Sequence, residues 1–180
     1  MKFTSLLASL LVVVPALLLS GCDSDTKVEN GNILNGQASI TLPAGFTRMP
    51  DEMLKVKYPQ AQRPNEAWYV ESENGKVSLA FSQTTQAMSE DQLSTFAGVI
   101  KKQFNAFSPK MTDTKVNGKK VVRIEMLTPD GNNPDGAKIY NLMQISSMNG
   151  KLLIATFNVT EDLQDKYQQS GKTALDSLAW

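Results

Sequence analysis

The sequence predicts an α+β domain in which helices flank a central antiparallel sheet. Three observations carry this prediction: runs of alternating apolar and polar residues, turn residues between those runs, and segments whose apolar residues recur at helical spacing. The expected order is strand, short helix, two strands, helix, four strands, helix. Strands that follow one another through tight turns pair antiparallel, and the helices between them pack on the resulting sheet.

The first half of the predicted domain holds three strands and a short helix. Ala38–Leu42 alternates apolar and polar residues and predicts the first strand. Asp51–Lys57 is long enough for one or two helical turns. Glu66–Glu71 and Lys76–Ser82 are expected to form a hairpin, because the Asn-Gly pair between them accepts the positive φ of a tight turn.

The second half begins with the strongest helix signal in the chain. Ser89 and Gln92 have the spacing of a capping box, and Pro109 marks the end of the segment. Between them the apolar residues recur on one helical face: Leu93, Phe96, Ala97, Ile100, Phe104 and Phe107.

Four strands and a final helix complete the predicted domain. The strands are expected at residues 112–116, 119–127, 138–147 and 151–159. Asn-Gly pairs separate the first two and the last two, which is a strong hairpin signal. The helix begins after Thr160 with two acidic residues at the positive end of its dipole, and Gly171 is expected to weaken or bend it. Its apolar face comprises Leu163, Tyr167, Ala174, Leu175 and Leu178.

Residues 1–21 are predicted to be a signal peptide. The apolar run Leu6–Leu19 is shorter than the ~20 residues that a membrane-spanning helix needs. It ends in Leu19-Ser20-Gly21-Cys22, which resembles the lipobox of bacterial lipoprotein precursors. That resemblance implies a lipid on Cys22 and a mature chain that is tethered to a membrane without spanning it. The alternative is an ordinary secretory signal followed by a chance cysteine.

The residue after the cysteine bears on the destination of the protein. Asp23 resembles the signal that keeps enterobacterial lipoproteins away from the outer membrane. We therefore expect a lipid-anchored protein of the bacterial envelope that faces the periplasm, with the inner membrane favoured over the outer membrane. Residues 22–36 are polar and are predicted to be a flexible tether, which leaves residues 37–180 as a single domain.

Composition excludes several classes of function. The whole chain has 18 basic and 18 acidic residues, and removing the leader takes only Lys2, so the mature chain carries a net charge of −1. Bulk nucleic-acid binding needs a clear basic excess, which this chain lacks, so nucleic acid is not an expected partner. The sequence contains no histidine and a single cysteine, so histidine-based catalysis and histidine zinc ligands are excluded. No cofactor and no metal are expected.

Motifs that could carry chemistry fail on inspection. Counted from Asp130, the loop Thr128–Gly136 has Asp135 where a calcium-binding EF-hand loop needs glycine, so it is predicted to be a solvated turn. Gly171-Lys172-Thr173 lacks the upstream glycine of a phosphate-binding loop. Ser24 and Lys27 have the spacing of a serine–lysine pair but lie in the tether. No catalytic residue is predicted.

Lys55–Trp68 is the most unusual segment, because it has neither helical nor strand periodicity. It combines two prolines with Tyr58, Arg63 and Trp68, and these side-chain types dominate protein–protein hot spots. One interpretation is a partner-binding loop that presents the three residues. The other is a packed crossover loop whose aromatic residues cover the sheet.

Taken together, the lipobox, the polar tether and the order of elements resemble the DcrB-type periplasmic lipoproteins and, more distantly, the PsbP-like sandwich shared with Mog-type Ran-binding proteins. The resemblance rests on Ala38–Pro43 as the entry strand, Trp68–Gln83 as the first hairpin, and the closing segment Ala174–Leu178. It implies an α/β/α sandwich that binds or supports other proteins, without catalytic residues.

The first functional hypothesis is therefore a membrane-anchored, periplasm-facing, non-catalytic module that binds a protein or supports an envelope process. An immunity protein against a periplasm-acting toxin is its sharper form. Two alternatives stay open. One is a carboxylate-dependent hydrolase, with carboxylates drawn from Asp51-Glu52, Glu71, Glu73 or Glu90-Asp91. The other is a carrier of small apolar ligands, held in a cavity lined by Phe96, Ile100 and Phe104.

Overall fold

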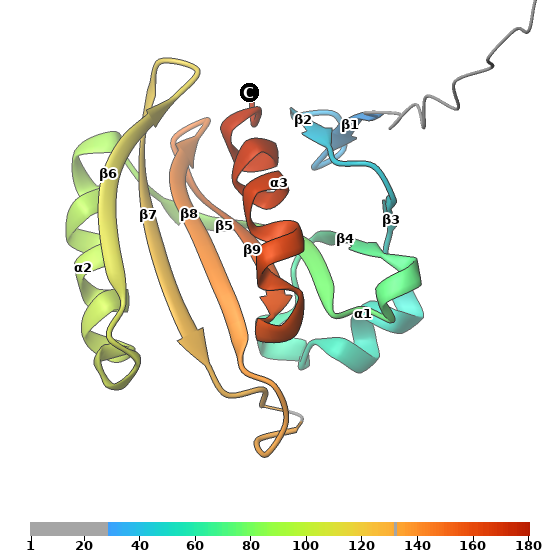
Figure 1. The fold of residues 1–180 in the computed structure, drawn as a ribbon. Coiled ribbons are helices and arrows are strands. Elements are labelled where there is room, and N and C mark those ends of the chain that lie inside the picture. The colour runs from blue at the N-terminus through green and yellow to red at the C-terminus, as the bar shows by residue number, and fades with distance from the viewer. Residues whose placement is uncertain (1–28, 132) are drawn as a thin grey trace, which may run out of the picture.

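The fold is a seven-stranded antiparallel sheet with helices on both faces and a separate two-stranded ribbon (Figure 1). It is seen in a computed structural model that describes residues 29–131 and 133–180. The sheet order is β3-β4-β5-β9-β8-β7-β6, and every neighbouring pair is antiparallel. The predicted α+β class is therefore confirmed.

The strands and helices lie close to the positions that the sequence predicts. The ribbon consists of β1 (Glu29–Ile33) and β2 (Ala38–Leu42). The sheet strands are β3 (Phe46–Arg48), β4 (Glu66–Val70), β5 (Val77–Ala87), β6 (Lys110–Val116), β7 (Lys119–Thr128), β8 (Ile139–Met148) and β9 (Lys151–Thr160). The α-helices are α1 (Asp51–Lys57), α2 (Leu93–Gln103) and α3 (Gln164–Asp176).

The three Asn-Gly pairs expected between sheet strands make tight turns: Asn74-Gly75, Asn117-Gly118 and Asn149-Gly150. Asn117 and Asn149 have φ of 49° and 53°, and each is followed by a glycine that also has positive φ. This left-handed pair is the geometry that matches the twist of adjacent strands. The turn residues therefore fix the register of the β6–β7 and β8–β9 hairpins.

The two faces of the sheet bury different clusters. One face, which we call the α3 face, packs against α3 and the ribbon through a large cluster that includes Leu79, Phe81 and Phe157. The opposite face, the α2 face, carries two separate clusters. One lies beneath α2 and includes Leu93 and Ile124, and the other lies beside α1 and includes Leu54.

Helix α3 approaches the sheet closely because residue 171 has no side chain. A Cβ at Gly171 would lie 2.5 Å from Cγ of Phe157 on β9. The sequence suggests a weak or bent helix at this glycine, but α3 runs through it from Gln164 to Asp176. Gly171 is therefore a packing residue.

The predicted tether is wrong for its second half. Residues 29–33 form β1, and Ile33 and Leu34 have exposed fractions of 0% and 5%. The backbone N–H of Leu34 donates to the buried carboxylate of Glu66, which also pairs with Arg48 at 3.0 Å. The folded domain thus includes residues 29–36 and does not begin at Gln37, because apolar residues in this stretch enter the core. The signal peptide, Cys22 and Asp23 lie outside the described residues.

The predicted capping box before α2 is confirmed. The helix itself is shorter than predicted. The Ser89 side chain and the Gln92 side chain cap each other's backbone N–H groups. The α-helix ends at Gln103, and residues 105–107 form a 3₁₀ turn. Phe107 consequently leaves the apolar stripe and is 38% exposed.

Candidate functional site

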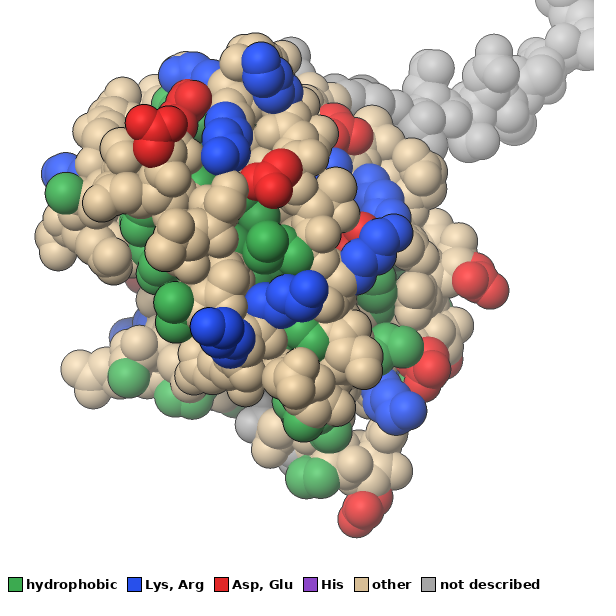
Figure 2. All heavy atoms as spheres, turned by 90° about the vertical axis from the view of Figure 1, so that its left-hand side faces the viewer, with side chains coloured by type: hydrophobic (Ala, Val, Ile, Leu, Met, Phe, Trp, Pro, Cys, Tyr) green, Lys and Arg blue, Asp and Glu red, His purple; other side chains and the backbone are tan. Residues whose placement is uncertain are grey.

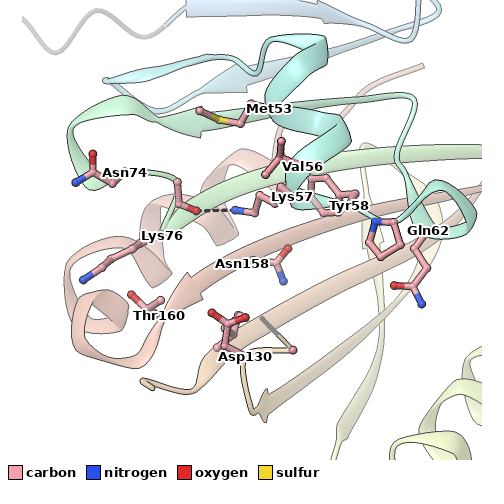
Figure 3. A pocket seen from close by; sticks show the side chains of 14 residues that line it. Met53, Val56, Lys57, Tyr58, Gln62, Asn74, Lys76, Asp130, Asn158 and Thr160 are labelled. Atoms are coloured by element: carbon pink, nitrogen blue, oxygen red, sulfur yellow. Dashed lines mark hydrogen bonds between the residues drawn. The ribbon is translucent and has the colours of Figure 1, made fainter. Parts of the chain in front are cut away.

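A cavity of about 620 Å³ lies on the α2 face, where α1, the β4–β5 turn and the β7–β8 loop come together (Figure 3). Its walls mix apolar, amide and charged side chains. The lining residues are Met53, Val56, Lys57, Tyr58, Pro59, Gln62, Asn74, Gly75, Lys76, Asp130, Gly131, Ile139, Asn158 and Thr160. Segments distant in the sequence thus form one concave site, as ligand sites commonly do.

Lys57, the last residue of α1, places an ammonium group in this cavity. Its Nζ donates to the carbonyl oxygen of Gly75 at 2.5 Å, drawn in Figure 3, and to Oγ of Ser78 at 3.3 Å. Burial lowers the pKa of Lys57, and the negative charge of Asp130 partly opposes that shift. The ammonium is therefore held by neutral oxygens while a carboxylate acts on it from further away.

Tyr58 follows Lys57 and packs against the cluster beside α1. Its hydroxyl is buried and makes no hydrogen bond of normal geometry to a described residue, although Ser78 lies near enough to act on it. Burial raises the pKa of Tyr58, and the Ser78 hydroxyl offsets part of the rise. Tyr58 therefore serves as a wall of the cavity with a neutral phenol.

The floor of the cavity is fixed by amides of neighbouring strands. Asn158 on β9 donates from Nδ2 to Oδ1 of Asn141 on β8 at 2.6 Å. Asn141 in turn donates to Oγ1 of Thr128 on β7 at 3.0 Å. These bonds hold the Asn158 amide in one orientation, so the floor presents a preset polar surface.

The lining of this cavity offers two lysines, one carboxylate and several amide and hydroxyl groups. Asp130 supplies the one carboxylate among the lining residues, whereas glycoside cleavage uses two flanking carboxyl groups. Within residues 29–131 and 133–180, no three residues of the metal-ligating types His, Cys, Asp and Glu come together. None of the helices in that part of the chain is long and apolar enough to cross a bilayer.

The structure does not bring Tyr58, Arg63 and Trp68 together. Tyr58 lies on the α2 face, whereas Trp68 on β4 packs into the cluster of the α3 face, near Gly31 of the ribbon. Arg63 is exposed at the end of the 3₁₀ turn Gln60–Gln62. The two aromatic residues pack, as the crossover-loop interpretation expects, and a partner-binding role stays a prediction for the exposed Arg63.

The residues proposed to line an apolar ligand cavity fill space instead. Phe96 and Ile100 pack against the cluster beneath α2. Phe104 lies 6.4 Å from Phe107, ring centre to ring centre.

The 128–136 loop, predicted to be a solvated turn, is exposed for most of its described length. Asp130 and Gly131 enter the cavity lining.

Sequence reasoning missed Lys57 and Asn158. Lys57 sits among several lysines in a short helix, and Asn158 is a polar residue in an alternating strand. Neither stands out until β9 is paired with β5 and α1 is placed over the sheet. No local signal marks them.

Comparison with solved structures gives the fold a known counterpart. The solution structure of the cyanobacterial PsbP protein from Synechocystis sp. PCC 6803 aligns with a TM-score of 0.55 at 13% identity. The alignment covers 89% of this chain and 96% of that protein. The fold is the PsbP-like sandwich.

Two further structures are similar. A protein from Bacteroides thetaiotaomicron VPI-5482 aligns with a TM-score of 0.54 at 10% identity, over 85% of this chain and 48% of that protein. The Ran-binding protein MOG1P of Saccharomyces cerevisiae aligns at 10% identity over 84% of this chain and 95% of that protein, with a TM-score of only 0.46.

No protein-family model and no curated protein matches the sequence. At identities this low the structural likeness establishes the fold alone. The PsbP-like part of the predicted resemblance is therefore confirmed as a fold, and the DcrB-type resemblance stays a prediction.

Proposed function

We propose that this protein is a lipid-anchored, periplasm-facing accessory module of the bacterial envelope, and that it binds another protein without catalysing a reaction. The observation that carries the proposal is the lipobox-like run Leu19-Ser20-Gly21-Cys22 at the end of a short apolar segment. The described domain adds a PsbP-like sandwich, a cavity with one carboxylate, and an exposed Arg63 next to the cavity-lining Gln62.

The anchor is tested by changing the lipidated atom. Cys22→Ala removes the thiol that would accept the lipid, so incorporation of a palmitate analogue is lost and the protein moves into the soluble periplasmic fraction. Ser24→Ala, two residues on, is the matched control and keeps both properties. Membrane retention of Cys22→Ala without label would refute the anchor.

Sorting to the inner membrane is tested at the next residue. Asp23→Ser removes the acidic residue that follows the proposed lipidated cysteine. If Asp23 holds the protein at the inner membrane, the variant moves to the outer-membrane band of a density gradient, while Asp25→Ser does not. An unchanged distribution of Asp23→Ser would remove Asp23 from the sorting proposal.

Partner binding is tested where the surface is reachable. A photo-crosslinking amino acid at position 63, in the otherwise unaltered anchored chain, is expected to capture a defined protein partner in living cells. The same amino acid at Lys101, an exposed position of α2, is the control. Capture of a toxin would support the narrower immunity role. The same crosslinked products at positions 63 and 101 would exclude Arg63 from the binding surface.

A further inference from the structure

Four lysines gather at one end of the sheet, within the β6–β7 and β8–β9 hairpins. Lys115 and Lys120 lie directly opposite each other across β6 and β7, and Lys119 and Lys151 lie next to the turns. None of the ion pairs among the described residues includes any of the four. Like charges paired directly across strands are destabilising, so this end is suited to an anionic partner.

The same end carries the start of the domain. The segment Ser177–Trp180 joins the ribbon to both hairpins. Toward the ribbon, Ser177 Oγ accepts from the N–H of Thr41 at 2.8 Å, and Ala179 bonds to Ser39 through both backbone groups. The ribbon and the two lysine hairpins are therefore parts of one surface, and Figure 1 shows them at the upper end of the molecule.

Toward the hairpins, the contacts of the same segment are equally direct. Asn117 in the β6–β7 turn donates to the carbonyl oxygen of Leu178 at 2.9 Å. The indole N–H of Trp180 donates to the carbonyl oxygen of Ser147 at 3.1 Å, and Nζ of Lys119 lies 5.0 Å from the centre of the Trp180 ring. Tryptophan is enriched at membrane–water interfaces, and here its ring has one lysine beside it.

The length of chain between Cys22 and the domain limits how the domain can face the membrane. Seven Cα steps separate Cys22 from Glu29, which is about 25 Å when fully extended. A compact domain of this size is roughly 40 Å across. A domain anchored by Cys22 is thus held nearer to the bilayer than its own diameter, and the end that carries β1 cannot point directly away from the lipid.

We propose that this lysine end, made of Lys115, Lys119, Lys120 and Lys151 with Trp180, lies against anionic phospholipid headgroups. The inference deepens the proposed function, because it rests on the lipid at Cys22. Acidic groups offset part of this positive charge. Glu90 and Asp91 follow Met88, whose N–H donates to Gly150 in the β8–β9 turn, and Asp113 precedes Lys115 by two residues on β6. Figure 2 shows basic side chains at the upper end of the molecule with acidic ones among them. The attraction between the lysines and the anionic lipid is modest. It is sufficient to orient the domain because the anchor already holds the lysines close to the membrane.

The test reads the position of Trp180, one of only two tryptophans. The mature lipidated Trp68→Phe protein is placed in vesicles whose lipids carry bromine near the headgroup, and quenching of tryptophan fluorescence is measured. Quenching is expected to be roughly twofold greater in equimolar phosphatidylglycerol and phosphatidylcholine than in phosphatidylcholine alone. It falls to the neutral-vesicle level at about 1 M salt, where the Debye length is about 3 Å. If Trp68→Phe unfolds, the signal of Trp180 is the difference between the unaltered chain and Trp180→Phe.

The lysines are tested with a matched set. Changing Lys115, Lys119, Lys120 and Lys151 together to glutamine abolishes the difference between the two vesicle types. The control set of Lys55, Lys101, Lys102 and Lys138, which are exposed and away from this end, leaves the difference intact. Sedimentation with vesicles but equal quenching in both lipids would overturn the docking alone. Failure of the lipidated chain to sediment with vesicles would overturn the anchor and the docking together.

Discussion

A single glycine sets how closely α3 can lie on the sheet. The ring of Phe157 occupies the space where any side chain at position 171 would start. Protein cores are packed like crystals, so such a contact is not relieved by small shifts without loss elsewhere. The intrinsic preference of a helix for alanine over glycine is about 1 kcal/mol and acts in the opposite direction.

We therefore predict that Gly171→Ala destabilises the protein by about 1–3 kcal/mol, since overpacking outweighs helix propensity here. Urea unfolding followed by circular dichroism measures the change. Gly98→Ala on α2 is the matched control, because a Cβ there meets nothing within 4 Å. It is expected to stabilise by up to about 1 kcal/mol. Equal effects of the two substitutions would contradict the packing role of Gly171.

Glu66 is a second residue whose role is visible only in the fold. Its buried carboxylate accepts from the N–H of Leu34 and pairs with Arg48, so it joins the ribbon to β4. We predict that Glu66→Gln lowers the free energy of unfolding by about 1–3 kcal/mol, because a buried charge-assisted hydrogen bond is weakened. The exposed Glu71→Gln is the control and should change stability by less than about 0.5 kcal/mol.

At the scale of elements, α3 is held by polar groups as well as by its apolar face. The hydroxyl of Tyr140 on β8 donates to Glu125 on β7 at 2.6 Å, and Lys172 on α3 pairs with the same carboxylate at 3.3 Å. Burial alone would raise the pKa of Glu125. The hydrogen bonds from Tyr140 and Lys172 outweigh it and leave the pKa lowered. The ionised carboxylate of Glu125 therefore holds α3 to the sheet.

Because these contacts need the ionised carboxylate, we expect the stability of the protein to fall in acid. A group whose pKa is lowered by folding contributes stability above its unfolded pKa, about 4.3 for glutamate, and loses it as the pH falls through the folded value. We expect the free energy of unfolding to decline as the pH is lowered below about 5, and Glu125→Gln to decline less steeply. Unfolding curves at a series of pH values measure both slopes. Parallel slopes would exclude Glu125 as a contributor.

Sequence patterns predicted those elements whose signal is local. The Asn-Gly hairpins, the capping box at Ser89 and the alternation in β7, β8 and β9 all depend on neighbouring residues, and each appears where expected. The ribbon strand β1 was missed because ENGNI is polar and its burial comes from pairing with β2. The three-residue β3 is too short to show any period.

At the scale of the whole molecule, the domain boundary is itself a prediction. A chain that begins at Gln37 lacks Ile33 and Leu34, whose burial contributes about 1.5–3 kcal/mol each. We expect it to be less stable than a chain that begins at Glu29 by about 3–6 kcal/mol. Thermal unfolding of the two chains side by side measures the difference. Equal midpoints would restore the longer tether that the sequence suggests.

The candidate site could be predicted only in fragments, for a reason that belongs to the whole fold. Tyr58 and Arg63 lie close in the sequence to the residues that matter, yet Trp68, five residues further on, crosses to the other face of the sheet. Asp130 and Asn158 line one cavity with Lys57 only because β7, β9 and α1 end at the same end of the sheet. Such convergence is set by topology, which no single segment encodes.

The division of the α2 face into two unconnected clusters has a dynamic consequence. Helix α1 has seven residues and only Leu54 fully buried, whereas β5 and β9 form the middle of the sheet. In native-state hydrogen exchange we expect the amides of α1 to exchange through local opening, long before those of β5 and β9, which need global unfolding. Local opening of α1 therefore exposes the corner beside Lys57 while the sheet stays folded.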